Sequence, residues 1–302
     1  MSKPMPFADR ESVLTPKKGY FVGTFFAMGC PCEVLVETGS TASAEQVLKC
    51  ARDEAWRIEA LWSRYLNSSI VETINSEPER RHLIDAETAA LFEYAQKLWQ
   101  LSAGKFDITS GVYRKIWSFD GGTIVPSREQ IERIRCFVGW DKVSWAERHL
   151  KMLPGMEIDL GGVGKEYAVD ACCKKISAFS DVSCLVNFGG DCATTKPPKT
   201  RPCWTLGIES VSHAGISSQN ISLVSGGVAT SGNVHRYVKH KGRRLSHVID
   251  AKTGWPIKNA PQTVTVKSNS CMEAGSLATL ACLQGADAGE FLADEAEHWI
   301  QP

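Results

Sequence analysis

The sequence predicts an α+β fold in which helices and strands are mixed. Helical and strand patterns follow one another along the chain, but without the regular strand, helix, strand order of a doubly wound sheet. The chain has 302 residues with 43% hydrophobic content, which is enough to bury a large core as one domain or two intimate halves. No internal repeat, low-complexity segment or change in composition marks a linker. We therefore expect an N-terminal extension over residues 1–20 and a single domain over residues 21–302.

The N-terminal third combines two strands and an amphipathic helix. Residues 21–37 have the pattern of a strand, a turn of small residues with the sequence M-G-C-P-C, and a second strand. Residues 44–66 place apolar side chains three and four positions apart, including Trp56, Ile58 and Trp62, as on one helix face. A second helix is predicted over residues 85–103, with Asp85 as its N-cap and Gly104 as its C-terminal stop.

The remaining elements are shorter and include an apolar strand that ends in a polar turn. Residues 182–188 form this strand, which leads directly into G-G-D. Residues 204–209 and 263–267 alternate as strands do. Residues 274–283 are small and apolar and predict a C-terminal helix.

Composition excludes several classes of partner. Lys plus Arg and Asp plus Glu both number 34, so the chain carries no net charge and no basic half, which argues against nucleic acid and anionic membrane as partners. No apolar run approaches the roughly 18 residues of a membrane span, and the charged, proline-containing start does not resemble a secretory leader. We expect a cytoplasmic protein, or a periplasmic one if a leader has been removed. The eleven cysteines are an odd number, which predicts buried reduced thiols rather than a complete disulfide framework.

Two glycine-rich stretches predict a site for a phosphate-bearing ligand. From Ile158 the sequence I-D-L-G-G-V-G-K takes an apolar strand end through a glycine turn and delivers Lys165 to the start of a helix. Backbone amides together with one ammonium suit an anion. Residues 225–256 add further turns rich in hydroxyl and short polar side chains.

These stretches belong to seven ordered blocks that resemble the ApbE family of flavin transferases, the FAD:protein FMN transferases. The resemblance extends from Met28 to about Leu292. Its blocks are M-G from Met28, S-R-Y-L-N-S-S-I-V-E-T-I-N from Ser63, G-K-F-D-I-T from Gly104, D-L-G-G-x-x-K-x-Y-A-V-D from Asp159, V-N-F-G-G-D from Val186, A-T-S-G from Ala229 and H-V-I-D-x-x-T-G-x-P from His247.

The resemblance implies an FAD site in a cleft between two interleaved halves. It also implies transfer of FMN to a threonine of an acceptor protein, release of AMP, and a magnesium ion that neutralises the phosphates. The candidate FAD-binding residues are Met28, Tyr65, Ser69, Asp107, Gly161, Gly162, Lys165, Asp170, Ser231, His247, Asp250 and Thr253. In the family the metal is held by a glycine-loop carbonyl and by an Asp and a Thr four residues apart on a helix. The matching positions here are Gly164, Gly275 and Thr279, and Thr279 is also the candidate catalytic residue.

Several of these residues also have purely structural interpretations. A solvated lysine at a helix start is the alternative for Lys165, and core packing is the alternative for Tyr65. The turn hydroxyls can bond their own backbone. Capping of a turn or helix is the alternative for Asp107, Asp159, Asp170, Asn187 and Asp191, and a pair that holds a hairpin together is the alternative for His247 with Asp250.

The chain departs from the family pattern at the expected metal ligand. The segment E-A-G-S-L-A-T matches the family threonine at Thr279 but has Gly275 where the carboxylate is expected. Glu273 is two positions away and therefore rotated by about 200° around the helix, so it replaces the carboxylate only after a local distortion. Glu166 stands where the family usually has glycine and adds negative charge beside the presumed phosphate site. We expect weak transfer unless Glu273 compensates, and a gain on Gly275→Asp.

Two classes of function follow from this departure. The first is a magnesium-dependent FMN transferase with a protein acceptor. The second is a protein that binds FAD without transferring it, as a carrier, sensor or subunit, and an FAD pyrophosphatase is a further variant of the enzyme. The sequence names neither the acceptor nor the oligomeric state.

Overall fold

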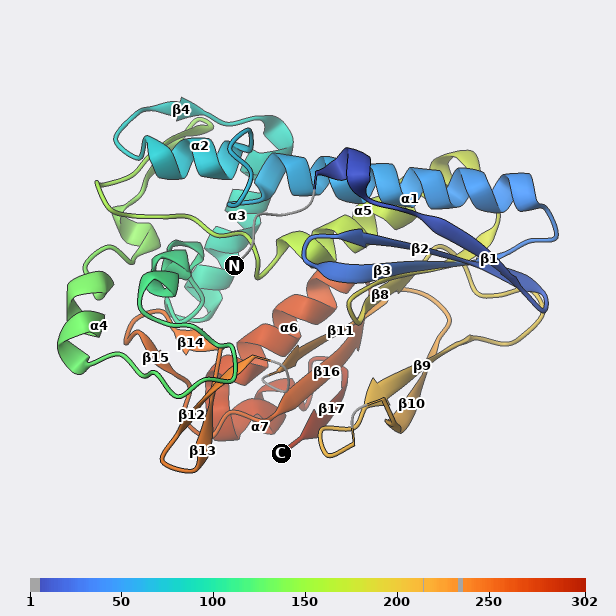
Figure 1. Ribbon diagram of the computed structural model, residues 1–302. Coiled ribbons are helices and arrows are strands. Elements are labelled where there is room, and N and C mark those ends of the chain that lie inside the picture. Colours follow the sequence, from blue (N-terminus) through green and yellow to red (C-terminus); the bar gives the residue numbers. More distant parts are fainter. Residues whose placement is uncertain (1–5, 214, 233–235) are drawn as a thin grey trace.

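An eight-stranded antiparallel sheet forms the centre of the molecule (Figure 1). The computed structural model describes residues 6–213, 215–232 and 236–302. The strands lie in the order β1-β2-β3-β7-β8-β11-β16-β17, and each pairs antiparallel with its neighbours. Their bounds are β1 Val13–Lys17, β2 Tyr20–Ala27, β3 Cys30–Glu37, β7 Ser183–Phe188, β8 Asp191–Thr194, β11 Gly227–Gly232, β16 Thr263–Ser268 and β17 Glu297–Gln301. The predicted α+β class is confirmed.

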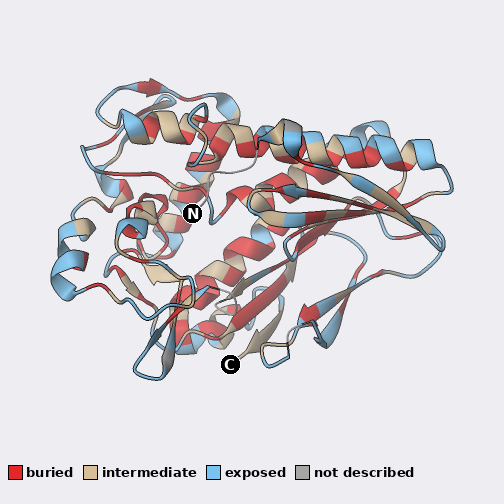
Figure 2. Cartoon of the chain, in the orientation of Figure 1, coloured by how far each residue is buried: buried red, intermediate tan, exposed pale blue. Residues whose placement is uncertain are grey.

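Three long helices cover one face of this sheet: α1 (Thr41–Trp62), α5 (Gly164–Phe179) and α6 (Cys271–Gln284). Along β7, Val186 joins the core under the helices, while Leu185 points to the opposite face. There it meets Trp204 of a hairpin made of β9 (Trp204–Glu209) and β10 (Ser217–Leu223). The buried residues therefore follow the inner side of each layer (Figure 2).

A second half is assembled from two separate insertions in the chain. One lies between α1 and α5, and the other lies between β11 and β16. Their side chains share a small core that includes Tyr113, Ile131 and Val238. The first insertion contains α2 Ile70–Ser76, β4 His82–Leu83, α3 Ala86–Leu101, η2 Ile108–Lys115, α4 Arg128–Arg135, η3 Trp140–Lys142, β5 Ser144–Ala146 and β6 His149–Lys151. The second contains β12 Tyr237–His240, β13 Arg243–Ser246, β14 Ile249–Asp250 and β15 Trp255–Pro256. The short elements η1 Phe7–Asp9, η4 Gly285–Asp287 and α7 Ala288–Leu292 complete the chain.

The helices begin where their capping residues predict. The Asp85 side chain accepts a hydrogen bond from the amide of Thr88 and caps α3, as expected. Ser40 does the same for Ser43 at the start of α1. This helix buries a stripe at the predicted spacing, but it covers Thr41–Trp62 rather than residues 44–66. The predicted strands at residues 21–37, 182–188, 204–209 and 263–267 and the helix at 274–283 are all present.

The segment expected as an N-terminal extension contributes the outer strand β1. It pairs with β2 from Val13 to Lys17, so the sheet begins before residue 21. Farther towards the N-terminus, the Arg10 guanidinium forms two hydrogen bonds with the Glu59 carboxylate of α1. No helix in the described part of the chain is long and apolar enough to span a membrane. Each of the eleven cysteines carries a free thiol, and seven of them are buried.

Candidate functional site

Lys165 and Asp191 form an ion pair where α5 begins against the central sheet. The glycine loop ends at Val163, so Lys165 lies in the first turn of α5. Its Nζ is 2.6 Å from Oδ2 of Asp191, the first residue of β8. Asp191 is buried, but 29% of the Lys165 side chain remains exposed. An anionic ligand can therefore reach the ammonium while Asp191 holds it in place.

The charges around this pair keep the lysine protonated. Burial acts to lower the pKa of Lys165, but the carboxylates of Asp191 and Glu166 outweigh it and move that pKa upward. For Asp191, burial is the stronger influence and raises its pKa in spite of the lysine. Lys165 thus presents a positive charge at neutral pH.

Two further predicted blocks join this pair through β11 and α6. The other carboxylate oxygen of Asp191 accepts a hydrogen bond from the Thr230 amide at 3.2 Å. The neighbouring Ser231 hydroxyl lies 2.8 Å from the Thr279 hydroxyl of α6. Residues from four distant parts of the sequence therefore meet at the start of α5.

The M-G-C turn between β2 and β3 lies beside the same ion pair. The Met28 amide donates a hydrogen bond to Glu59 at 2.8 Å, and Met28 has a positive φ of 50°. A Cβ placed on Gly189, in the β7–β8 turn, would lie 2.9 Å from Cys30 Cβ and 3.8 Å from Lys165 Nζ. The predicted block at Met28 is thus part of the same region.

Arg64 anchors the start of the glycine loop through two ion pairs, a role that no sequence pattern predicts. Its Nη1 lies 2.6 Å from Asp159 Oδ2, and its Nη2 lies 2.6 Å from Glu157 Oε2. Asp159 also accepts a hydrogen bond from the Gly161 amide at 2.8 Å. Gly161 and Gly162 are exposed, and a Cβ on Gly162 would lie 3.2 Å from the Phe106 ring of the G-K-F-D-I-T block.

The H-V-I-D-A-K-T-G block packs against the turn at Lys105. The Ala251 amide donates to the Lys105 carbonyl at 3.0 Å, and the Tyr113 hydroxyl donates to the Ala251 carbonyl at 2.9 Å. Asp250 accepts from the Lys252 amide at 2.8 Å within the turn, where Thr253 is exposed. All seven blocks are therefore connected by direct contacts rather than scattered over separate surfaces.

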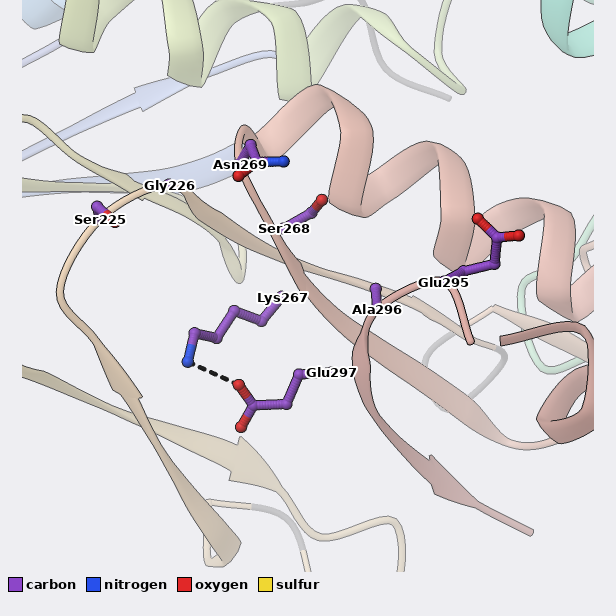
Figure 3. A pocket seen from close by; sticks show the side chains of 8 residues that line it. All are labelled: Ser225, Gly226, Lys267, Ser268, Asn269, Glu295, Ala296 and Glu297. Carbon is purple, nitrogen blue, oxygen red and sulfur yellow. Dashed lines mark hydrogen bonds and ion pairs between the residues drawn. The ribbon is translucent and has the colours of Figure 1, made fainter. Parts of the chain in front are cut away.

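Lys165 and Thr279 do not line either of two hollows on the described surface. One of about 540 Å³ lies between the Gly104 turn, α4 and Ala251, and includes the predicted residue Asp107. The other, of about 400 Å³, lies at the ends of β16 and β17, where Lys267 and Glu297 pair at 2.7 Å (Figure 3). The second hollow contains none of the predicted FAD-binding residues.

Comparison with known proteins relates this arrangement to one family. The model of the ApbE family matches residues 28–301, which is most of the chain. The chain belongs to the ApbE family. Among its relatives are proteins named FAD:protein FMN transferase from Haemophilus influenzae, 25% identical over 95% of this chain and 85% of that protein, and from Escherichia coli, 26% identical over 90% and 79%. The relative of that name from Vibrio cholerae is 29% identical over 73% of this chain, which spans 66% of that protein, just under two thirds.

Solved structures of ApbE proteins share the fold. The crystal structure of the ApbE protein from Thermotoga maritima has a TM-score of 0.84 and 28% identity, covering 93% of this chain and 94% of that one. The flavin transferase ApbE from Vibrio cholerae has a TM-score of 0.79 and 22% identity, covering 97% and 93%. Because the Vibrio cholerae structure is only 22% identical to this chain, its similarity shows a shared fold and nothing more.

Within this ApbE fold, three predicted FAD-binding residues have their polar groups engaged in the protein. The two carboxylate oxygens of Asp170 accept the Cys271 and Met272 amides at 2.9 Å each and so cap α6. Asp107 caps η2 and accepts the Trp140 amide at 2.8 Å, while burial raises its pKa. Ser69 is fully buried and caps α2. These contacts favour the structural interpretations that the sequence left open. Tyr65, in contrast, is 50% exposed.

Gly275 provides no side chain to the expected magnesium site, but the carboxylate of another residue lies beside it. Glu166 projects from α5 towards Gly275, where a Cβ would lie 2.6 Å from Glu166 Cγ and 3.0 Å from Oε1. Glu166 Oε2 is buried and has no hydrogen-bond partner among the described residues. Burial, together with the charge of Asp191, raises the Glu166 pKa to about 8. A buried carboxylate oxygen without a partner is the type of group that a cation satisfies.

The remaining oxygen donors agree with a magnesium site of few protein ligands. Gly164 is buried in the first turn of α5, and Thr279 lies one turn after Gly275 on the same face of α6. No group of three or more His, Cys, Asp or Glu side chains among the described residues is placed to hold a metal. Magnesium is commonly bound by one or two carboxylates together with substrate phosphates, so the residues fit the ion. The Oε2 atom of Glu273 is already engaged, because it accepts from the Ser268 hydroxyl at 2.6 Å and the Asn269 amide at 3.2 Å.

His247 makes the free energy of unfolding depend on pH in the acidic range. Burial, followed by the nearby Arg236 charge, lowers its pKa to about 4, and Nδ1 has no partner among the described residues. Since the unfolded chain takes up this proton near pH 6.5 and the folded chain only near pH 4, stability is complete above about pH 6.5. It is then lost at about 1.4 kcal/mol per pH unit as the pH falls.

We therefore expect the free energy of urea unfolding to decrease more steeply with acid in the wild type than in His247→Gln. Below about pH 4 the two curves should run parallel. Equal slopes of the two proteins between these pH values would contradict the assignment to His247.

Proposed function

We propose that this chain is an FAD:protein FMN transferase that moves FMN from FAD to a threonine hydroxyl of an acceptor protein. The observation that carries the proposal is that direct contacts connect the seven family blocks, and that Lys165, whose side chain is 29% exposed, lies among the blocks that begin at Met28, Val186 and Ala229. In the proposed reaction, the threonine oxygen bonds to the FMN-side phosphorus of FAD. The bond from that phosphorus to the bridging oxygen breaks, AMP leaves with the bridging oxygen, and the hydroxyl proton is released.

The chain's own residues supply binding and electrostatic stabilisation for this step. Lys165 faces the pyrophosphate and is held there by Asp191. The exposed glycines Gly161 and Gly162 let the phosphate backbone approach closely, while Arg64 keeps their loop in place through Asp159. His247 is proposed to contact FAD through Nδ1, a buried atom that has no hydrogen-bond partner among the described residues.

A divalent cation, proposed to be Mg²⁺, completes the site when it is bound. Such an ion would neutralise charge that develops on the transferring phosphoryl group. The oxygen donors between the first turn of α5 and the Gly275 to Thr279 face of α6 would hold it. Lys165 approaches the phosphates from the β8 side, so positive charge is available from two directions.

The second candidate function is FAD binding without transfer, and the glycine at position 275 favours it. One sample distinguishes the possibilities. The protein is titrated with FAD by calorimetry, with and without magnesium, and then incubated with lysate proteins of its source organism. AMP release with FMN bound covalently to a protein supports the transferase. AMP with free FMN supports a pyrophosphatase, and intact bound FAD supports a carrier or sensor.

A further inference from the structure

Glu166 is a buried carboxylate with one oxygen atom that has no hydrogen-bond partner among the described residues. Its residue is only 8% exposed, and its Oε2 accepts no hydrogen bond from any described residue. Isolated buried charges are strongly unfavourable, and native proteins pair them or use them to coordinate metals. The local charge is also unbalanced, because the groups that act on Glu166 are Asp191, Lys165 and Asp170, two carboxylates and one ammonium.

Lys165 is not free to balance Glu166. Its Nζ is already paired at 2.6 Å with Asp191, which is itself buried. Asp170 directs both oxygens at the amides that begin α6. Glu166 therefore remains as the one acidic group of this set with an oxygen atom that lacks a partner among the described residues.

Glu166 takes the volume that a side chain at position 275 would need. The distance from a Cβ on Gly275 to Glu166 Cγ would be 2.6 Å, which is shorter than real carbon contacts, and the distance to Cδ would be 3.1 Å. Because glycine has no Cβ, the Glu166 side chain can pack directly against the backbone of α6 at position 275. The carboxylate arrives from α5, but it stands over the helix face that carries Thr279 one turn later.

We infer that Glu166 is the carboxylate ligand of the divalent cation, and that it replaces from α5 the carboxylate that α6 lacks at Gly275. The two positions are exchanged as a pair: a glutamate on one helix requires a glycine on the other. The inference rests on the proposed function only for the choice of ion. It also reverses the expectation from sequence for Gly275→Asp, because a new carboxylate there meets Glu166 instead of completing an empty site.

The test measures binding of the metal itself, with Mn²⁺ as a probe for Mg²⁺. Free Mn²⁺ is followed by electron paramagnetic resonance in titrations of the FAD-loaded wild type and of four variants. Glu166→Gln keeps the shape of the side chain and removes its charge. Glu273→Gln is the matched control, since this carboxylate lies on the first turn of α6 but bonds Ser268 and Asn269. Gly275→Asp is made alone and together with Glu166→Gly, and thermal unfolding shows that each variant is folded.

We expect Glu166→Gln to weaken Mn²⁺ binding by at least about tenfold, and Glu273→Gln to leave it within about twofold of the wild type. Gly275→Asp alone should bind no better than the wild type and unfold at a lower temperature, while the exchanged pair recovers binding. Wild-type affinity in Glu166→Gln, or absence of Mn²⁺ binding in the wild type, would overturn the inference.

The outcome is independent of whether FMN is transferred. Loss of Mn²⁺ binding in Glu166→Gln, combined with a wild type that leaves FAD intact, supports the ligand and rejects the transferase. Transfer that persists in Glu166→Gln with unchanged Mn²⁺ affinity supports the transferase and rejects the ligand.

Discussion

Lys165→Met is expected to reduce FMN transfer by about 10²- to 10³-fold, as the loss of one preorganised charge at a reacting phosphate typically does. The ammonium lies within 2.6 Å of a buried aspartate and keeps 29% of its side chain exposed, so it is both positioned and accessible. Its substitution also leaves Asp191 buried without its cation. We expect this loss to lower the free energy of unfolding by about 3–5 kcal/mol.

The activity and stability effects can be separated by a second substitution. Lys165→Met combined with Asp191→Asn removes both charges, so most of the stability should return while transfer remains low. Lys196→Met is the matched control, because Lys196 pairs with Asp181 on the exposed surface and its loss should cost less than about 1 kcal/mol. AMP release at saturating FAD and urea unfolding provide the measurements. A stable double variant with wild-type transfer would show that Lys165 serves only the fold.

The sequence predicted those features of the fold that are encoded locally. Apolar spacing defines α1, and the Asp85 side chain caps α3 as its position suggested. The glycine loop with Lys165 was recognised for the same reason, since a strand, a turn and a helix start follow one another within a few residues. Its ligand, in contrast, was inferred from the order of seven blocks and not from any one of them.

The contacts that complete the site could not be predicted because they join distant residues. Arg64 reaches Glu157 and Asp159 across 93 and 95 positions, and no local pattern pairs them. From the sequence, Glu273 is the candidate to replace the carboxylate at Gly275, because it is a neighbour on the same helix. The structure instead places Glu166, from helix α5, beside Gly275. In the sequence, Glu166 indicates only an additional negative charge next to the phosphate site.

Arg64→Met is expected to lower the free energy of unfolding by about 1–3 kcal/mol, because Glu157 keeps other cations and Asp159 is partly exposed to water. The Arg64 side chain is 4% exposed and divides its two terminal nitrogens between Glu157 and Asp159, so its removal takes one ion pair from each carboxylate. Lys115 and Arg114 still contact Glu157, at 2.7 and 3.1 Å, which leaves Asp159 with the greater loss. Because Asp159 also holds the Gly161 amide, the glycine loop should loosen and FAD affinity should fall.

Arg64→Lys separates charge from geometry at this position. A lysine keeps the positive charge but lacks the planar fork that reaches both carboxylates, so it should recover only part of the stability. Arg80→Met is the surface control, since Arg80 and Glu77 are both largely exposed and their pair contributes at most about 1 kcal/mol. Urea unfolding and FAD titration of the folded fraction test these expectations. Full stability with unchanged FAD affinity in Arg64→Met would mean that the loop is held by the Asn75 contacts to Ile158, at 2.7 and 2.9 Å, and not by Arg64.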